Sequence, residues 1–269
     1  MKKKFKLGVI GAGFMSSAII NGVIRSKILL PSDIIVSDVS DEKLEKMASI
    51  GVSTSKDNLD VCNLSDFVLF AVKPQSFGEV LSAIKETTCE KFISIMAGVK
   101  KDTIKFGFIN NVCVARCMPN TPCAISNGAV GIDLTDFEFE SDKRFIKNLF
   151  SSLACVVEVD ESLLGTVTGV SGSAPAYFYL FLKSIVDAGV KRGLSYDDAK
   201  TLAVNTMIGA GKMVLENPEK SLDELINAVC SKGGTTIEAI KVFNENDISS
   251  ITDKAVDACV KRSVELENL

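Results

Sequence analysis

Histidine and tryptophan are both absent from this sequence of 269 residues. Histidine is the side chain that most often moves protons near neutral pH, so a dehydrogenase with a histidine acid–base is excluded and any proton transfer must rely on other groups. The eight cysteines include no CxxC pair, and the usual zinc sites cannot be built without histidine. We therefore expect no metal site, and reduced, mostly buried thiols.

Long hydrophobic runs are also missing. No apolar run reaches the roughly 20 residues that cross a bilayer, and Phe5–Ile10 is too short for the core of a signal peptide. The net charge of −4 supplies no overall basic field to attract nucleic acid. With 46% hydrophobic residues the chain can form an ample core. We expect a globular, cytoplasmic protein that binds neither nucleic acid nor membrane.

A glycine turn follows the first apolar run. Lys6–Ile10 is typical of a short strand, and after Gly11-Ala12-Gly13 the apolar period changes to that of a helix. Such a turn lets a pyrophosphate approach a helix N-terminus, and Ser16 takes the third, small position of the dinucleotide fingerprint. The pattern favours dinucleotide binding over a purely structural turn.

Asp38 ends the second apolar run, Ile34–Ser37. An acid about 20 residues beyond the glycine turn commonly accepts hydrogen bonds from the adenosine ribose and repels a 2′-phosphate, which favours NADH. Lys43 lies close enough in sequence to offset this charge. The alternative is that Asp38 or Asp41 only caps the helix that follows.

Two further strands end in residues that suit a cofactor crevice. Phe67–Val72 is apolar throughout, as in a parallel strand covered on both faces, and leads into Lys73-Pro74. Phe92–Ile95 leads into Met96-Ala97-Gly98. Lys73 either faces the ligand or is a surface residue before a proline turn. Arg116, which ends the next strand, is either a buried ion pair or a crevice residue, and both alternatives stay open.

The pattern changes near Asp160. Up to that point strands alternate with helices, which predicts a doubly wound, mostly parallel α/β sheet, a Rossmann-like domain over residues 1–161. Residues 162–269 carry only helical patterns. The stretch Tyr177–Val186 is apolar on nearly every face, so it belongs in a core or an interface. This surplus of apolar surface predicts an all-helical domain that forms an intertwined dimer.

A second glycine turn lies in the helical half. Gly233 and Gly234 stand between Lys232 and Thr235-Thr236, just before an apolar, helix-like run. The free amides of a helix start can hold a carboxylate. The alternative is a tight turn in which Thr235 or Thr236 is the N-cap.

Five motifs together resemble the pyrroline-5-carboxylate reductase family over essentially the whole chain. They are GAGFMSSAI (11–19), AVKPQ (71–75), MPNTP (118–122), GVSGSAPAY (169–177) and GGTTI (233–237). The resemblance implies NADPH- or NADH-dependent reduction of 1-pyrroline-5-carboxylate to L-proline, the last step of proline biosynthesis. It also implies an interlocked homodimer, often assembled into a decamer, with each active site between the nucleotide domain of one subunit and helices of its partner.

Site residues are implied at the positions that match the family motifs. The cofactor would be bound by Gly11, Ala12, Gly13, Phe14, Met15, Asn58, Ala71, Val72, Lys73, Pro74, Met96, Ala97 and Gly98. The substrate would be bound by Ser231, Gly233, Gly234, Thr235 and Thr236, with Thr236 as the catalytic hydrogen-bond partner of the ring nitrogen.

The sequence departs from the family pattern at two positions. Lys232 stands where proline is usual, and Ser16 stands where alanine is usual. Neither departure removes a catalytic atom, but Asp38 puts the usual NADPH preference in doubt. Two rival hypotheses remain. One is a related reductase of hydroxy acids or other imines with Lys183 as its acid, and the other is a catalytically silent NAD(P)-binding sensor.

Overall fold

The computed structural model describes residues 4–267. The chain divides into two compact units. The first comprises Met1–Ser173 together with Ala258–Leu269, and the second comprises Ala174–Asp257. Each unit is described by itself.

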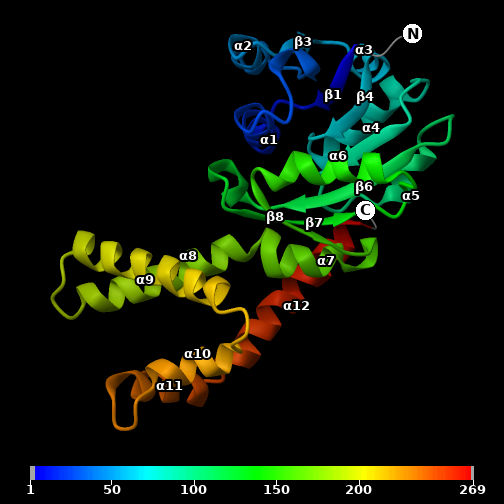
Figure 1. Cartoon of the computed structure of the whole chain (residues 1–269). Helices are drawn as coiled ribbons and strands as arrows, with labels where there is room; N and C mark the ends of the chain where they lie inside the picture. The colour runs from blue at the N-terminus through cyan, green and yellow to red at the C-terminus, as the bar shows by residue number, and fades with distance from the viewer. Residues whose placement is uncertain (1–3, 268–269) are drawn as a thin grey trace. The chain divides into compact units, whose positions relative to one another are not determined.

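The first unit is built on one sheet of eight strands (Figure 1). The strands are β1 (Phe5–Ile10), β2 (Ile34–Ser37), β3 (Ser53–Ser55), β4 (Ser65–Phe70), β5 (Lys91–Ser94), β6 (Cys113–Pro119), β7 (Gly128–Asp133) and β8 (Ala154–Glu158). Their order is β3-β2-β1-β4-β5-β6-β7-β8, and only β6 and β7 pair antiparallel within the described residues. The predicted doubly wound, mostly parallel sheet is confirmed.

Helices cover both faces of this sheet. They are α1 (Phe14–Arg25), α2 (Asp41–Ser49), α3 (Asn58–Leu64), α4 (Pro74–Ile84), α5 (Lys101–Phe106), α6 (Glu140–Ser151) and α7 (Leu164–Val167). Apolar residues of α1 and α6 share one buried cluster with Leu7 and Val9 of β1, whereas those of α3, α4 and α5 share a second cluster with Phe5 and Ile10. Because successive strand residues point to opposite faces, a strand covered on both sides must be apolar throughout.

The direction of winding reverses at β1. From β1 the chain adds β2 and β3 on one side, then returns to place β4 on the other side of β1. Ligands of such sheets bind at the carboxyl ends of the strands where the order reverses. The fold thus places the carboxyl ends of β1, β2 and β4 at the expected crevice.

Short irregular helices join the main elements of this unit. Three are 3₁₀ helices, at Pro31–Asp33, Thr121–Ile125 and Glu161–Leu163, and Thr168–Gly172 forms a π-helix that leads into the second unit. The side-chain amide of Asn120, in the MPNTP motif, donates to the backbone oxygen of Ser171 at 3.4 Å. Two of the family motifs therefore lie side by side.

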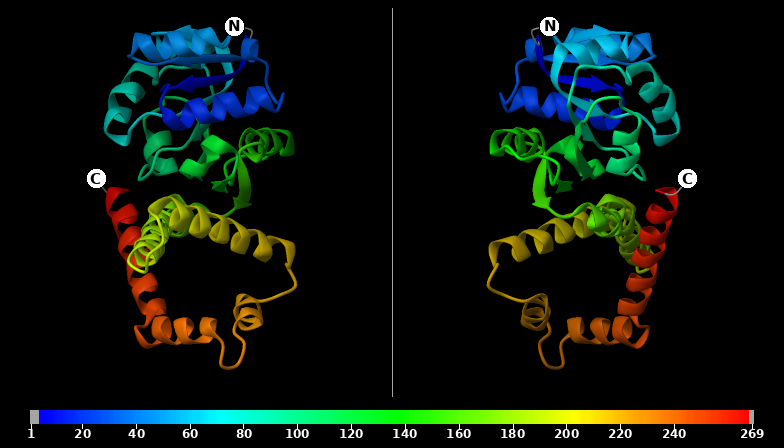
Figure 2. Two further views of the ribbon diagram at one scale, coloured as in Figure 1. Left: turned by 90° about the vertical axis from the view of Figure 1, so that its left-hand side faces the viewer. Right: turned by 90° about the vertical axis from the view of Figure 1, so that its right-hand side faces the viewer.

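The second unit consists of helices. They are α8 (Ala174–Val190), α9 (Tyr196–Glu216), α10 (Leu222–Val229), α11 (Thr235–Glu245) and the beginning of α12 (Ile248–Leu266). Helices α8 and α9 are in contact and lie next to each other in Figure 1, whereas Figure 2 views α8 nearly along its axis and shows α9 at an angle to it. A capping box begins α10, because the side chains of Ser221 and Glu224 each accept a hydrogen bond from the backbone amide of the other.

Large apolar side chains of the second unit are exposed in the single chain. On α8, Phe178, Tyr179 and Leu180 are 58%, 63% and 67% exposed. Contiguous exposed apolar surface of this kind marks an interaction site. The apolar pattern of α8 therefore belongs to a face that this unit alone does not bury.

A buried charge cluster secures the start of α5 to the strand β7. The ammonium group of Lys101 lies 2.6 Å from Asp133 and 3.1 Å from Asp136, and Lys105 lies 2.6 Å from Asp136. Burial favours the neutral form of Asp136, but the hydrogen bonds from Lys105, the Val114 amide and Lys101 outweigh it, so its pKa is lowered from the ordinary 3.8. Likewise burial opposes the charge of Lys101, yet its bonds to Asp133 and Asp136 raise its pKa.

We expect the variant Asp136→Asn to lose about 2 kcal/mol of unfolding free energy near neutral pH, because charged hydrogen bonds are lost. A lowered pKa stabilises the fold above the unfolded value of 3.8 and stops doing so as the pH falls through the folded value. The difference from the parent protein should therefore persist at pH 5 and shrink below about pH 4. Urea unfolding at several pH values measures it. Asp66→Asn, which removes an exposed pair with Lys6, is the matched control and should change stability by less than about 1 kcal/mol.

Candidate active site

The first glycine turn is tightly fixed by the protein itself. Gly11 follows β1 with φ of +102°, a left-handed conformation that favours glycine. A Cβ at this position would lie 2.8 Å from the backbone oxygen of Ala71, and the Gly11 amide donates to the Ser37 oxygen at 2.7 Å. Gly11 is therefore required by the fold.

Gly13 differs from Gly11 in this respect. It is the N-cap of α1 with φ of −80°, which any residue adopts, and its position receives no side-chain cap. Apart from its neighbours along the chain, a Cβ built on Gly13 would meet no atom of residues 4–267 within 4 Å. The described part of the protein gives no reason for a glycine here, so the open space in front of α1 fits a ligand. An anion such as a pyrophosphate suits the free amides of a helix start.

Asp38 lies directly beside this turn, at the end of β2. Its Oδ2 accepts a hydrogen bond from the Ala12 amide at 2.8 Å, and its Oδ1 accepts one from the Ser40 amide at 2.9 Å. The Lys43 ammonium group lies 3.2 Å away. Burial raises the pKa of Asp38, but these partners outweigh it and lower the pKa below 3.8, so the side chain is charged near neutral pH. Neither Asp38 nor Asp41 is the N-cap of α2, because Ser40 occupies that position.

The other predicted cofactor residues lie at the same edge of the sheet. Asn58 begins α3 and accepts a hydrogen bond from the Ser37 hydroxyl at 2.7 Å. Ala71 and Val72 follow β4, and the exposed Lys73 is the N-cap of α4 with Pro74 as its first residue. Met96, Ala97 and Gly98 follow β5, and Gly98 has φ of +71°. The fold thus brings together all the residues predicted to bind the dinucleotide, and their binding role stays a prediction.

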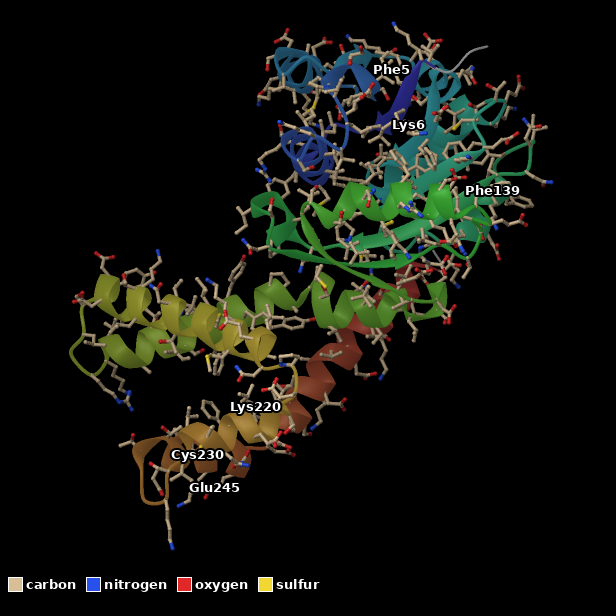
Figure 3. All side chains as sticks on the ribbon, viewed as in Figure 1. Phe5, Lys6, Phe139, Lys220, Cys230 and Glu245 are labelled. Atoms are coloured by element: carbon tan, nitrogen blue, oxygen red, sulfur yellow. The ribbon has the colours of Figure 1, made fainter. Side chains whose placement is uncertain are left out.

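The second glycine turn lies in the second unit, between α10 and α11. Figure 3 labels Cys230, which ends α10 just before this turn. Gly233 has φ of +73°, and the Gly234 amide donates to the Ser231 oxygen at 2.9 Å. Gly234 is the N-cap of α11 and has no side-chain cap in the described chain. Thr235 and Thr236 are the first two residues of this helix, so the alternative in which one of them is the N-cap is wrong.

The hydroxyl groups and amides at the start of α11 are accessible within the second unit. Ser231, Lys232, Gly233 and Thr235 are exposed, and Gly234 and Thr236 are partly buried. A helix start without a side-chain cap retains amides that can bind a carboxylate. The predicted substrate residues therefore form one continuous segment, and all the predicted cofactor residues lie in the first unit.

Arg116 proves to be a buried ion pair, which decides between its two alternatives. Its guanidinium group is 3% exposed and lies 2.9 Å from Glu161 and 3.0 Å from Glu267. Sequence reasoning missed both carboxylates. Glu161 follows directly after Asp160, where the strand pattern stops, but nothing in the sequence indicates that it pairs with Arg116. Glu267 lies 151 positions from Arg116, too far for any local pattern to connect them.

Other sequence expectations concern the cysteines, metals and membranes. The eight cysteines form no disulfide within the described residues, and four of them are buried. Residues 4–267 contain no cluster of histidine, cysteine or acidic side chains that could hold a metal ion. In the same range, every helix is too short or too polar to cross a membrane.

A doubly wound sheet with a glycine turn at its reversal point, followed by a helical unit, defines a dinucleotide-dependent oxidoreductase. Residues 6–98 match the family model of the coenzyme F420-dependent NADP oxidoreductases, and residues 161–266 match that of pyrroline-5-carboxylate reductase dimerisation. The chain is 38% identical over 264 residues to pyrroline-5-carboxylate reductase of Methanosarcina acetivorans, with 97% of each protein covered. It belongs to the pyrroline-5-carboxylate reductase family, which confirms the resemblance seen in the sequence.

Solved structures agree with this assignment. A pyrroline-5-carboxylate reductase from Coxiella burnetii superposes with a TM-score of 0.90 at 31% identity, covering 98% of this chain and 99% of that one. The Plasmodium falciparum enzyme, solved with NADP bound, gives a TM-score of 0.86 at 27% identity, covering 99% of this chain and 100% of that one. The match therefore includes both the sheet and the helices.

Substitution of the two glycines of the first turn should have different effects, on stability at Gly11 and on cofactor affinity at Gly13. We expect Gly11→Ala to lower the melting temperature, because its Cβ would press on Ala71 and its φ is left-handed. We expect Gly13→Ala to keep the melting temperature while raising the dissociation constant of NAD(P)H about tenfold or more, the effect of about 1.4 kcal/mol. Thermal melts and nicotinamide fluorescence titrations measure the two effects. Unchanged cofactor affinity in a folded Gly13→Ala protein would contradict a pyrophosphate site there.

Proposed function

We propose that this chain is a working pyrroline-5-carboxylate reductase, which reduces 1-pyrroline-5-carboxylate to L-proline with NADPH or NADH, the last step of proline biosynthesis. The observation that carries the proposal is the match along 97% of the chain to a reductase of that name, with both glycine turns intact. The accessible start of α11 supports a working enzyme over a silent cofactor sensor.

The cofactor is held by the first unit. Gly13 leaves room for the pyrophosphate in front of α1, and the amides of Phe14 and Met15 face it. Asp38 binds the adenosine ribose, and the segments Ala71–Pro74 and Met96–Gly98, with Asn58, complete the site. The bound nicotinamide supplies the hydride. Lys73 either contacts the ligand or shapes the crevice.

The substrate is held at the start of α11. Its carboxylate binds the free amides of the helix start, together with Ser231, Gly233, Gly234 and Thr235. Lys232 is exposed beside this segment, where a positive charge attracts the carboxylate. The hydroxyl of Thr236 donates a hydrogen bond to the ring nitrogen. The single turn therefore orients the substrate at both of its polar groups.

Reduction of the C=N bond adds a hydride to C5 and requires a proton on nitrogen. Pyrroline nitrogen is basic enough to take up this proton from water near neutral pH, so the chain needs no strong acid. This chemistry suits a protein without histidine. The protein's contribution is to align the imine with the hydride donor, with Thr236 fixing the nitrogen.

The rival reductase hypothesis gives Lys183 the role of the acid. Lys183 lies on α8, is exposed and forms a hydrogen bond with Asp187 that raises its pKa. An exposed, strongly paired lysine is a poor proton donor near neutral pH. We therefore favour Thr236 over Lys183.

The chain self-associates through its helical part, whose family model is one of dimerisation. We propose an intertwined homodimer that assembles further into a decamer, located in the cytoplasm. Exposed apolar residues on α8 and α9, such as Phe178 and Leu202, supply surface for the dimer. We further propose sequence domains of 1–161 and 162–269, supported by the family model that covers residues 161–266. The compact units divide differently, because the first unit extends to Ser173 and also includes Ala258–Leu269.

We expect Thr236→Ala to lower kcat by about tenfold or more, since the loss of about 1.4 kcal/mol in the transition state has that effect. Thr236→Ser, which keeps the hydroxyl, should retain most of the activity. The affinity for NAD(P)H should stay unchanged in both variants. Thr206→Ala on α9, whose hydroxyl bonds to its own helix, is the control. Turnover that is unaffected in Thr236→Ala would discard the catalytic role.

Oxidation of NADH and NADPH with pyrroline-5-carboxylate tests the function and the cofactor preference together. Because Asp38 is charged and bonded to the glycine turn, we expect NADH to be favoured. Asp38→Asn should raise the NADPH-to-NADH ratio of kcat/KM by about tenfold. Asp41→Asn, which removes an exposed partner of Lys56, is the control. No oxidation of either cofactor would refute the reductase, and an unchanged ratio would refute the role of Asp38.

A further inference from the structure

The loop that follows β5 is held by the end of the chain. Gly98 has φ of +71°, and a Cβ there would lie 2.7 Å from Cβ of Leu266 and 3.2 Å from its carbonyl carbon. Residues Ala258–Leu269 belong to the first compact unit, as does this loop. The last turn of α12 therefore packs directly against the backbone of Gly98, the last residue of the segment Met96–Gly98.

The same loop is tied at its far end by two carboxylates. Oε1 of Glu161 accepts the Lys101 amide at 2.8 Å and also binds Arg116 at 2.9 Å. Glu267 binds the second guanidinium nitrogen at 3.0 Å, and the Lys100 ammonium group lies 3.9 Å from it. One buried guanidinium group thus joins the loop after β5, the segment after β8 and the end of α12.

Such a cluster contributes more to geometry than to stability. Burying charged groups costs free energy that their mutual attraction only partly returns, whereas the fork of an arginine fixes two carboxylates in direction. Glu161 binds one terminal nitrogen of Arg116 and Glu267 binds the other. Movement of either carboxylate therefore shifts the guanidinium group, and with it the other carboxylate. The conformation of Met96–Gly98 therefore depends on residues far from it in sequence.

We propose that Arg116, Glu161 and Glu267 form a positioning cluster for the cofactor, through which the last turn of α12 sets the conformation of the loop Met96–Gly98. The inference rests on the proposed function of that loop in cofactor binding. The three residues touch neither cofactor nor substrate in this role. They act on cofactor affinity by holding the loop in its binding conformation.

The test is steady-state kinetics of Glu267→Ala in the full-length protein. The expected result is a five- to tenfold higher KM for NAD(P)H, with less than a twofold change in kcat at saturating cofactor and in the KM for pyrroline-5-carboxylate. Glu267→Gln keeps an oxygen that accepts a hydrogen bond from Arg116, so its KM for NAD(P)H should lie between those of the parent protein and Glu267→Ala. Glu265→Ala, which removes an exposed pair with Arg262 on the same helix, is the matched control and should leave all constants unchanged.

A variant of the loop itself distinguishes the cofactor-binding role of Met96–Gly98 from the positioning role of Arg116, Glu161 and Glu267. Ala97 is exposed between Met96 and Gly98, and Ala97→Val should raise the KM for NAD(P)H if the loop binds cofactor. If Ala97→Val raises the KM for NAD(P)H while neither Glu267→Ala nor Glu267→Gln changes it, the positioning role is overturned and the proposed function stays intact. No effect of Ala97→Val on this KM refutes the role of the loop, and the inference falls with it. A lower melting temperature with unchanged KM in both Glu267 variants also overturns it, because the cluster would then be structural only.

Discussion

The hydrogen bond from the Ala12 amide to Asp38 is the constraint on which the candidate nucleotide site depends. At 2.8 Å it ties the turn after β1 to the end of β2. Since the Ala12 amide donates to a carboxylate, it is not free for an anion, whereas the amides after Gly13 at the start of α1 have no side-chain cap, and anion binding there stays a prediction. The same bond keeps a negative charge beside the turn, where we expect it to disfavour a cofactor with a 2′-phosphate.

The same glycine turn before a helix occurs twice in the chain. In each case a glycine with positive φ precedes a glycine N-cap that has no side-chain cap within the described residues: Gly11 and Gly13 before α1, and Gly233 and Gly234 before α11. A serine or aspartate at either N-cap would satisfy the first amides of the helix internally. A glycine leaves them to a ligand, which suits a pyrophosphate at one turn and a carboxylate at the other.

Local signals in the sequence predicted much of the fold and of the candidate site. The strand β1, the glycine turn and Asp38 could be found because each lies in a short pattern, and parallel strands bring their carboxyl ends to one edge. The apolar face of α8 was also predicted, although the single chain leaves it exposed. By contrast, the alternative in which Thr235 or Thr236 is the N-cap rested on residue propensity alone, and it is wrong because the chain uses Gly234. The partners of Arg116 could not be predicted, because no periodicity links residues 45 and 151 positions apart.

The two charge clusters of the first unit converge on Lys101. Its side chain enters the cluster of Asp133 and Asp136, while its backbone amide donates to Glu161 and so to the cluster of Arg116. The beginning of α5 is thus fixed by its side chain and its backbone at once. At the other end of the loop, the Ile95 amide still donates to Phe70 of β4, so the sheet holds this loop only as far as Ile95. Between Ile95 and Lys101, the atoms nearest to a Cβ built on Gly98 all belong to Leu266. The end of α12 therefore restricts the loop in the part that the sheet does not hold.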